Sequence, residues 1–416
     1  MRKKFLLAIG VLLPLLLLTL ITTSSIWYPQ RAGDQARRYT RPFEFDYFYW
    51  TMQSLWEKSG QATLSIESGI NSFKSRAIIL DFLDLIQQIH DLDQQILQVY
   101  SNPEITNPAE DAKALITQKE RAEAAFTQQR LLAESILQSQ ISAVLTKNGL
   151  IFIQSPFPPV LFKITSLPDQ LILSPRSVIR EEASISLEPG LSDQQKDELE
   201  KNVSDNLDMS ALVVPLGGVG VYPTMVYREA SLEYLIRVIA HEWIHNYLAF
   251  KPLGWHYDAS PQLRTMNETT AELCATEISQ SVLRSFYAEP SSTGKDKDVF
   301  AVSNNQNESF NFNKEMHATR VAVDELLAQG KIEEAEKLME EKRGFFWENG
   351  YQIRKLNQAY FAFYGAYADK PLGAAGNDPV GPAVRALREK SRTMQEFLKR
   401  ISVMTSFEAL QKSISD

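Results

Sequence analysis

The segment Val238–Tyr247 constrains this chain more than any other, because it holds two histidines at helical spacing. It reads V-I-A-H-E-W-I-H-N-Y, with His241 and His245 four residues apart. On an α-helix, residues four apart lie on the same face, so both imidazoles would project in the same direction. Two imidazoles at this spacing can bind one Zn²⁺, and Glu242 would lie within reach of a water molecule beside the ion. The segment therefore predicts a metal site on a helix.

The residues around this segment predict the helix itself. Apolar residues recur there at three- and four-residue spacing, which is typical of a helix with one buried face. They are Leu232, Leu235, Ile236, Ile239, Trp243, Ile244 and Leu248. Ser231 can cap the start of the helix, and Pro252 and Gly254 mark its end. The alternative is a buried helix with two chance histidines, but the chain has only five histidines, which makes that spacing improbable by chance.

The same window resembles the extended consensus of zincin metallopeptidases, in which uncharged residues flank both histidines and a hydrophobic residue closes the motif. A catalytic zinc ion normally takes three protein ligands and a water molecule, so a third ligand is needed. The metzincin type would supply it through a glycine and a histidine soon after His245. Leu248 stands where that glycine should be, and no histidine follows at the required distance.

Downstream, the segment Met266–Glu272 reads M-N-E-T-T-A-E and resembles the gluzincin pattern. The resemblance implies Glu268 as the third zinc ligand and Glu272 as the outer carboxylate that orients a ligating imidazole. Without the upstream motif, these two glutamates would indicate a solvated helix face. His256 is the rival third ligand. It lies eleven residues beyond His245 with no helical register, so Glu268 is favoured.

Gluzincins stabilise the oxyanion with a histidine, tyrosine or arginine from a C-terminal helical region, a role that needs a donor near the developing charge. Two patches in that part of the chain carry candidates: His317 and Arg320 in the first, and Tyr360, Tyr364 and Tyr367 in the second. The sequence does not rank them, and ordinary packing is the alternative for each. We take Arg320 and Tyr360 as the candidates.

Composition limits the class of protein. The chain has 416 residues, of which 44% are hydrophobic and 23% charged, as in soluble globular proteins. The net charge of −8 and the lack of a basic stripe with aromatic residues argue against a nucleic-acid partner. The single cysteine, Cys274, excludes an internal disulfide and is interpreted as a small buried residue.

The N-terminus predicts a targeting segment. Arg2, Lys3 and Lys4 precede an apolar run from Phe5 to Ile21. Residues 1–25 therefore read as a signal peptide or a transmembrane signal anchor. The basic start would remain inside, so we expect the rest of the protein to be membrane-anchored or secreted, with its catalytic part outside the cytoplasm.

The whole chain predicts an α+β fold that is mainly α. A linker at 26–41 would lead to a helical domain at 42–148, in which two long helices form an antiparallel hairpin or bundle. A zincin-like domain at 150–290 would contain a small mixed sheet with an edge strand beside the active-site helix. Residues 308–416 would add a helical C-terminal part.

The segment Ala211–Val226 is the candidate edge strand. Its prolines and glycines exclude a regular central strand and indicate an edge strand or a bulge. In zincin-like folds, an edge strand beside the active-site helix receives the peptide substrate by strand addition. A plain bulge or turn is the alternative.

These observations lead us to expect a zinc metallopeptidase that acts on a peptide or protein. Glu242 would be the general base of hydrolysis. The alternative is a non-catalytic, membrane-tethered interaction protein in which the metal is structural or absent. The two differ in coordination, because a structural zinc site tends to be closed by four protein ligands. Whether single residues are removed or internal bonds are cut stays open.

Overall fold

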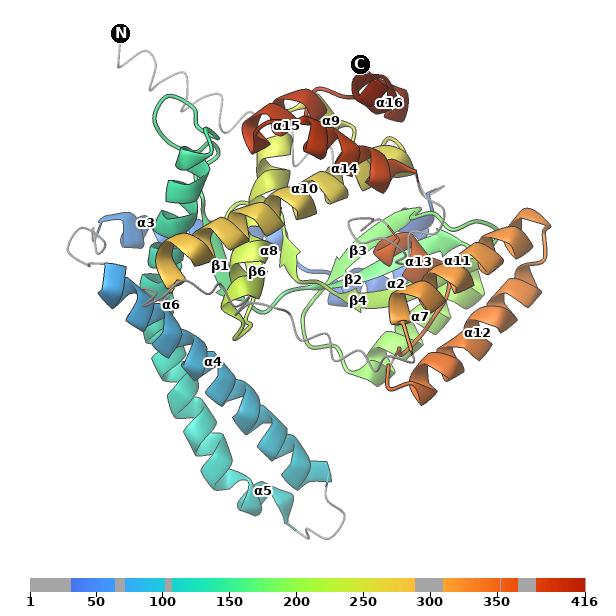
Figure 1. Ribbon diagram of the computed structural model, residues 1–416. Coiled ribbons are helices and arrows are strands. Elements are labelled where there is room, and N and C mark those ends of the chain that lie inside the picture. Colours follow the sequence, from blue (N-terminus) through green and yellow to red (C-terminus); the bar gives the residue numbers. More distant parts are fainter. Residues whose placement is uncertain are drawn as a thin grey trace, which may run out of the picture.

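The computed structural model describes residues 31–63, 72–101, 107–288, 310–351, 353–365 and 379–415. It consists mainly of helices, with two small sheets near the centre of the molecule (Figure 1). The predicted α+β, mainly α fold is confirmed.

Long helices dominate the N-terminal part, which comprises α2 (Ala32–Thr40), η1 (Arg41–Phe43), α3 (Tyr47–Thr63), α4 (Ser72–Ser101), α5 (Pro108–Asp111) and α6 (Lys113–Lys147). Helices α4 and α6 lie side by side and extend away from the rest of the molecule, as the predicted hairpin (Figure 1). Phe82 of α4 stacks on Phe126 of α6, with ring centroids 5.3 Å apart. Residues 32–40 of the predicted linker form helix α2, because Ala36 and Tyr39 pack into the core of a sheet.

Six short strands form two three-stranded sheets. The strands are β1 (Phe162–Thr165), β2 (Asp169–Pro175), β3 (Ala183–Leu187), β4 (Met209–Pro215), β5 (Gly218–Val219) and β6 (Thr224–Tyr227). The mixed sheet has the order β1-β6-β5, with β1 parallel and β5 antiparallel to β6, and the other sheet, β3-β2-β4, is antiparallel. The predicted edge segment 211–226 thus supplies an edge strand to each sheet.

Helices α8 (Leu232–Leu248) and α10 (Pro261–Val282) pack against each other and form the centre of the main core. Each begins with a serine cap: Ser231 Oγ accepts from Tyr234 N at 3.3 Å, and Ser260 Oγ accepts from Leu263 N at 3.2 Å. Leu235 and Ile239 of α8 are fully or almost fully buried, and each contributes roughly 1.5–3 kcal/mol. Cys274 is buried in α10, as expected.

The remaining helices cover this framework. They are α7 (Asp193–Leu207), α9 (Pro252–Trp255), the π-helical turn η3 (Leu283–Tyr287), α11 (Phe312–Ala328), α12 (Ile332–Glu348), α13 (Gln358–Tyr364), α14 (Val380–Lys390), α15 (Met394–Ile401) and α16 (Phe407–Ser415). Helices α14 and α16 pack on α10, whereas α13 lies on one face of the antiparallel sheet and α7 on the other.

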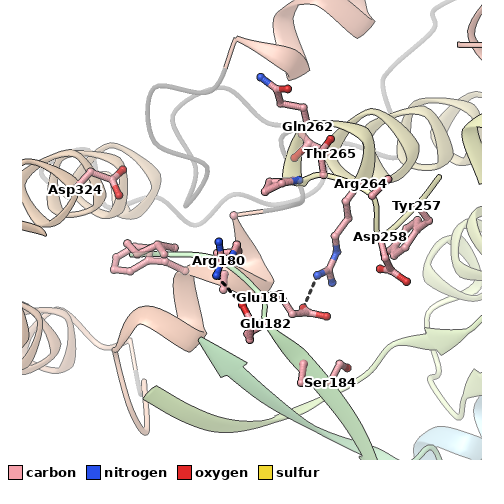
Figure 2. A pocket seen from close by; sticks show the side chains of 18 of the residues that line it. Arg180, Glu181, Glu182, Ser184, Tyr257, Asp258, Gln262, Arg264, Thr265 and Asp324 are labelled. Carbon is pink, nitrogen blue, oxygen red and sulfur yellow. Dashed lines mark hydrogen bonds and ion pairs between the residues drawn. The ribbon is translucent and has the colours of Figure 1, made fainter. Parts of the chain in front are cut away.

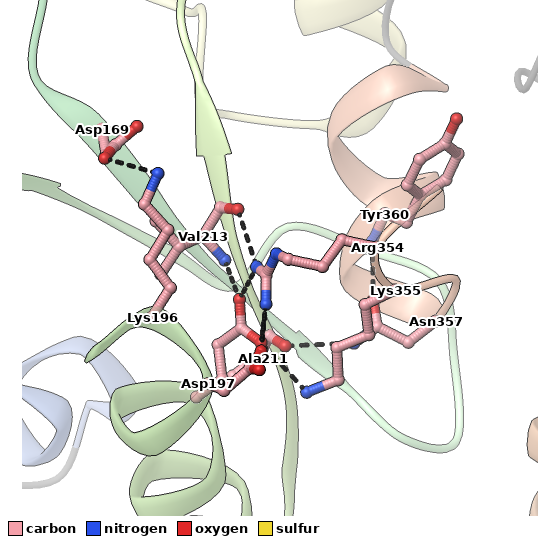
Figure 3. Close-up of polar contacts among 10 residues, drawn as sticks. Asp169, Lys196, Asp197, Ala211, Val213, Arg354, Lys355, Asn357 and Tyr360 are labelled. Atoms are coloured by element: carbon pink, nitrogen blue, oxygen red, sulfur yellow. Dashed lines mark hydrogen bonds and ion pairs between the residues drawn. The ribbon is translucent and has the colours of Figure 1, made fainter. Parts of the chain in front are cut away.

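Buried ion pairs fasten the C-terminal part to the antiparallel sheet (Figure 3). Glu200 of α7 is fully buried and accepts a hydrogen bond from Val213 N of β4 at 2.6 Å. The same carboxylate pairs with Arg354 and, at 3.2 Å, with Lys355. Arg354 also donates to Val213 O at 3.2 Å. These bonds connect strand β4 to the segment before α13.

The structure corrects the prediction of a transmembrane signal anchor. In the part of the chain that it describes, no helix is both long enough and apolar enough to cross a membrane. Helices α4 and α6 have the length, but both carry many charged side chains, which a membrane span excludes. Residues 1–25, on which that prediction was based, lie outside the described residues.

A second buried carboxylate, Glu134 of α6, anchors the mixed sheet. It is fully buried, accepts from Ile164 N of β1 at 2.7 Å, and pairs with Lys58 at 2.5 Å and Arg130 at 3.1 Å. Burial lowers the pKa of Lys58 despite this pairing.

We predict that Glu134→Gln lowers the free energy of unfolding by about 3 kcal/mol, because it removes the buried counter-charge of Lys58 and leaves Arg130 with Glu57 as its remaining partner. Urea denaturation measures the change. Glu120→Gln, at an exposed position of the same helix, is the matched control and should change stability by less than about 0.5 kcal/mol. Equal effects of the two substitutions would contradict this account.

Candidate metal centre

Two helices bring the three predicted metal ligands together. His241 and His245 project from α8 with their Nε2 atoms 3.0 Å apart. Glu268 of α10 places its Oε2 atom 3.4 Å from Nε2 of His241 and 3.5 Å from Nε2 of His245. Ligands about 2.0–2.1 Å from a tetrahedral zinc ion lie about 3.3 Å from one another. The three atoms therefore surround one point, and the group could bind a metal ion.

The chemistry of the donor atoms fits this role. Glu268 is 4% exposed, so the segment around it is core and not a solvated helix face. Its Oε2 atom is buried and has no hydrogen-bond partner within the described residues. A buried acceptor without a partner is costly. A cation at the shared point would satisfy this oxygen and both Nε2 atoms together.

The outer ring nitrogens of both histidines are held by acceptors from α10. Nδ1 of His241 lies 3.1 Å from Oε2 of Glu272, and Nδ1 of His245 lies 2.8 Å from Oδ1 of Asn267. When Nδ1 carries the proton, Nε2 presents its lone pair toward the shared point. Arg237 of α8 donates to the same Glu272 carboxylate. Helix α10 thus orients both imidazoles.

The electrostatics of the group favour a positive charge. Burial disfavours the imidazolium of His241, but the nearby carboxylates of Glu268 and Glu272 outweigh it and raise the pKa of His241 to about 10. Burial tends to raise the pKa of Glu268, whereas the charge of His245 and the proximity of both imidazoles hold that pKa well below its usual range. Protons and metal ions compete for such sites, so a bound metal ion would replace the histidine protons.

Glu242 lies against two glycines, Gly218 of β5 and Gly220 just after it. Its side chain is buried, and burial raises the pKa of its carboxyl. A Cβ atom on Gly218 of β5 would lie 2.6 Å from Oε1 of Glu242, and one on Gly220 would lie 3.2 Å from Oε2. Only glycine at position 218 allows the backbone to pass this close to the carboxylate.

Tyr257 belongs to the site but was not among the predicted residues. Its hydroxyl donates to Oε1 of Glu268, the oxygen that does not face the histidines. The guanidinium of Arg264 lies 5.6 Å from the centre of the Tyr257 ring and forms an ion pair with Glu181. The sequence contains one signal for this role, a tyrosine in the loop between the two ligand helices. Nothing in the local pattern shows which way it points.

The other candidates contact residues outside this group of three ligands. His256 is exposed, and its Nδ1 atom lies 2.8 Å from the carbonyl oxygen of Pro252. Arg320 pairs with Asp324 at 2.8 Å. Tyr360 packs on Tyr364, with ring centroids 4.5 Å apart, against the antiparallel sheet.

Of the two remaining oxyanion candidates, the structure locates one. His317 of α11 has a buried Nδ1 atom without a hydrogen-bond partner in the described residues. Tyr367 lies outside the described residues.

Comparison of the chain with protein-family models, with curated proteins and with solved structures finds no match. The interpretation of the site therefore depends on its geometry and chemistry.

We predict that Gly218→Ala destabilises the protein by about 1–3 kcal/mol, because the new methyl group would overlap Glu242 and Val238. Gly344→Ala, in the exposed interior of α12 with no atom near the added Cβ, should instead stabilise the protein by about 0.5–1 kcal/mol. Urea denaturation of both variants gives the two signs. A neutral or stabilising Gly218→Ala would contradict the close approach of β5 to Glu242.

Proposed function

We propose that this protein is a zinc-dependent peptidase of gluzincin type. One observation carries the proposal: the ligand atoms of His241, His245 and Glu268 converge on one point, next to which Glu242 projects from the same helix. The sequence resemblance to gluzincins supports the same residues. A buried carboxylate beside a metal site is the arrangement that metal-assisted hydrolysis requires.

The donor set supports zinc with a catalytic rather than a structural role. Two imidazole nitrogens and one carboxylate oxygen form a common ligand set of catalytic zinc. In the part of the chain that the structure describes, no fourth histidine, cysteine or acid joins the group. A fourth position would therefore be free for water or substrate. When bound, Zn²⁺ supplies Lewis acidity, which favours ionisation of water near pH 7 and polarises a carbonyl group.

Residues of the chain would transfer the proton and orient the metal ligands. Glu242 would accept a proton from the attacking water and deliver it to the leaving amine. Tyr257 would hold the carboxylate of Glu268 in its orientation through the hydrogen bond to Oε1. Glu272 and Asn267 would keep the imidazoles of His241 and His245 turned toward the metal.

Strand β5 would align the substrate. It is an edge strand, and on its outer side it pairs with no strand that the structure describes. Its residue Gly218 approaches the Glu242 carboxylate. An extended peptide that pairs with this edge would present its backbone to the general base. This supports a peptide rather than a small amide as the substrate.

Cleavage of a peptide library by the zinc-loaded full chain tests the proposal. We expect the native protein to cleave peptides and Glu242→Gln to be about 10²–10⁴-fold slower while it retains its zinc. Glu233→Gln, in the first turn of the same helix, is the matched control and should cleave at the native rate. Mass spectrometry of the products distinguishes terminal from internal cleavage.

Two outcomes would contradict the proposal. One is a zinc-loaded native protein that cleaves no member of the library, which would favour a non-catalytic role for the metal. The other is a Glu242→Gln variant that cleaves as fast as the native protein.

A further inference from the structure

A cavity of about 940 Å³ lies beside the candidate metal centre (Figure 2). Its walls come from the start of β3 and the preceding loop, from residues 257–265 at the start of α10, and from α11 and α13. Tyr257 is part of the wall, and its hydroxyl donates to the ligand residue Glu268. One side chain therefore separates the cavity from a metal ligand.

The walls of the cavity are unusually rich in charge. Its carboxylates are Glu181, Glu182, Asp258 and Asp324. Its guanidiniums are Arg180, Arg264 and Arg320. Apolar side chains such as Ile179 and Phe361 line the rest of the cavity.

Each guanidinium already has a carboxylate partner. Arg180 pairs with Glu182 at 2.7 Å, Arg264 with Glu181 at 2.5 Å, and Arg320 with Asp324 at 2.8 Å. Figure 2 shows the first two pairs across the lower wall.

The fourth carboxylate, Asp258, forms no hydrogen bond or ion pair with any other residue that the structure describes. It is exposed and adjoins Tyr257 in the chain. The cavity therefore has one carboxylate more than it has guanidiniums, and the unmatched one lies close to the metal centre.

The neighbouring carboxylates are already compensated. Glu181 pairs with Arg264, and Oε2 of Glu268 faces the Nε2 atoms of His241 and His245. Asp258 is therefore the carboxylate of this wall that is left to attract a cation entering the cavity.

We propose that this cavity binds a cationic group of the substrate, an ammonium or guanidinium ion, with Asp258 as its counter-ion. The inference rests on the proposed peptidase function, because it assigns this cavity to the substrate of the same site. The cation has two sources, the α-amine of a peptide or the side chain of a lysine or arginine near the scissile bond. Both present the same chemistry to Asp258.

Four small amides with one carbon skeleton separate these sources: lysinamide, Nα-acetyllysinamide, norleucinamide and Nα-acetylnorleucinamide. They carry both cations, the side-chain cation alone, the α-amine alone, and no cation. Their dissociation constants are measured by calorimetry on zinc-loaded Glu242→Gln, in which hydrolysis is slow. Binding needs no cleavage, so a failure here is distinguishable from a failure of the proposed function.

We expect at least one cationic amide to bind about fivefold more tightly than Nα-acetylnorleucinamide, as for a partly exposed ion pair. Adding Asp258→Asn should remove that preference, and 0.5 M salt should weaken it. Asp205→Asn, an exposed aspartate of α7 that lies outside the cavity, should leave the preference intact. Preference for Nα-acetyllysinamide identifies the side chain as the source, and preference for norleucinamide identifies the α-amine.

Equal binding of all four amides would overturn the proposal, as would a cation preference that survives Asp258→Asn. Loss of peptide cleavage alone would not.

Discussion

The packing of α10 against α8 is the contact on which the rest of the site depends. Neither helix carries the three-residue ligand set alone, because α8 supplies two imidazoles and α10 supplies the carboxylate. The same contact also provides Glu272 and Asn267, the acceptors for the outer nitrogens of both histidines. The apolar core beneath the two helices fixes their relative position. Hydrophobic burial thus places the ligands, and hydrogen bonds then orient them.

The candidate metal centre has a strand edge on one side and a charged cavity on the other. On one side, strand β5 passes close to Glu242, and its outer edge pairs with no strand in the part of the chain that the structure describes. On the other, Tyr257 separates Glu268 from a charged cavity. In our proposal, the backbone of a substrate would pair with the edge of β5. A cationic group of the substrate would bind in the cavity.

The sequence predicted what depends on short-range spacing and missed what depends on long-range placement. Helical periodicity located α8. The resemblance to gluzincins implied Glu268, because the segment Met266–Glu272 matches the gluzincin pattern downstream of the two histidines. Tyr257 was missed because only the folded loop shows its orientation. Arg320 and Tyr360 were chosen by residue type, and their role stays a prediction. Arg320 pairs with Asp324 and lines the charged cavity, and Tyr360 packs against the antiparallel sheet. The edge segment divides between two sheets because its strands pair with distant partners: β4 pairs with β2, and β6 pairs with β1.

Elemental analysis of the purified protein after zinc loading and dialysis tests the central claim most directly. The account predicts one equivalent of zinc in the native protein. Glu268→Ala should lose most of it, because the ion loses one of its three protein ligands, and Glu233→Ala, at a carboxylate of the first turn of α8 outside the ligand group, should keep it. A native protein that retains no zinc, or a Glu268→Ala variant that retains a full equivalent, would contradict the account.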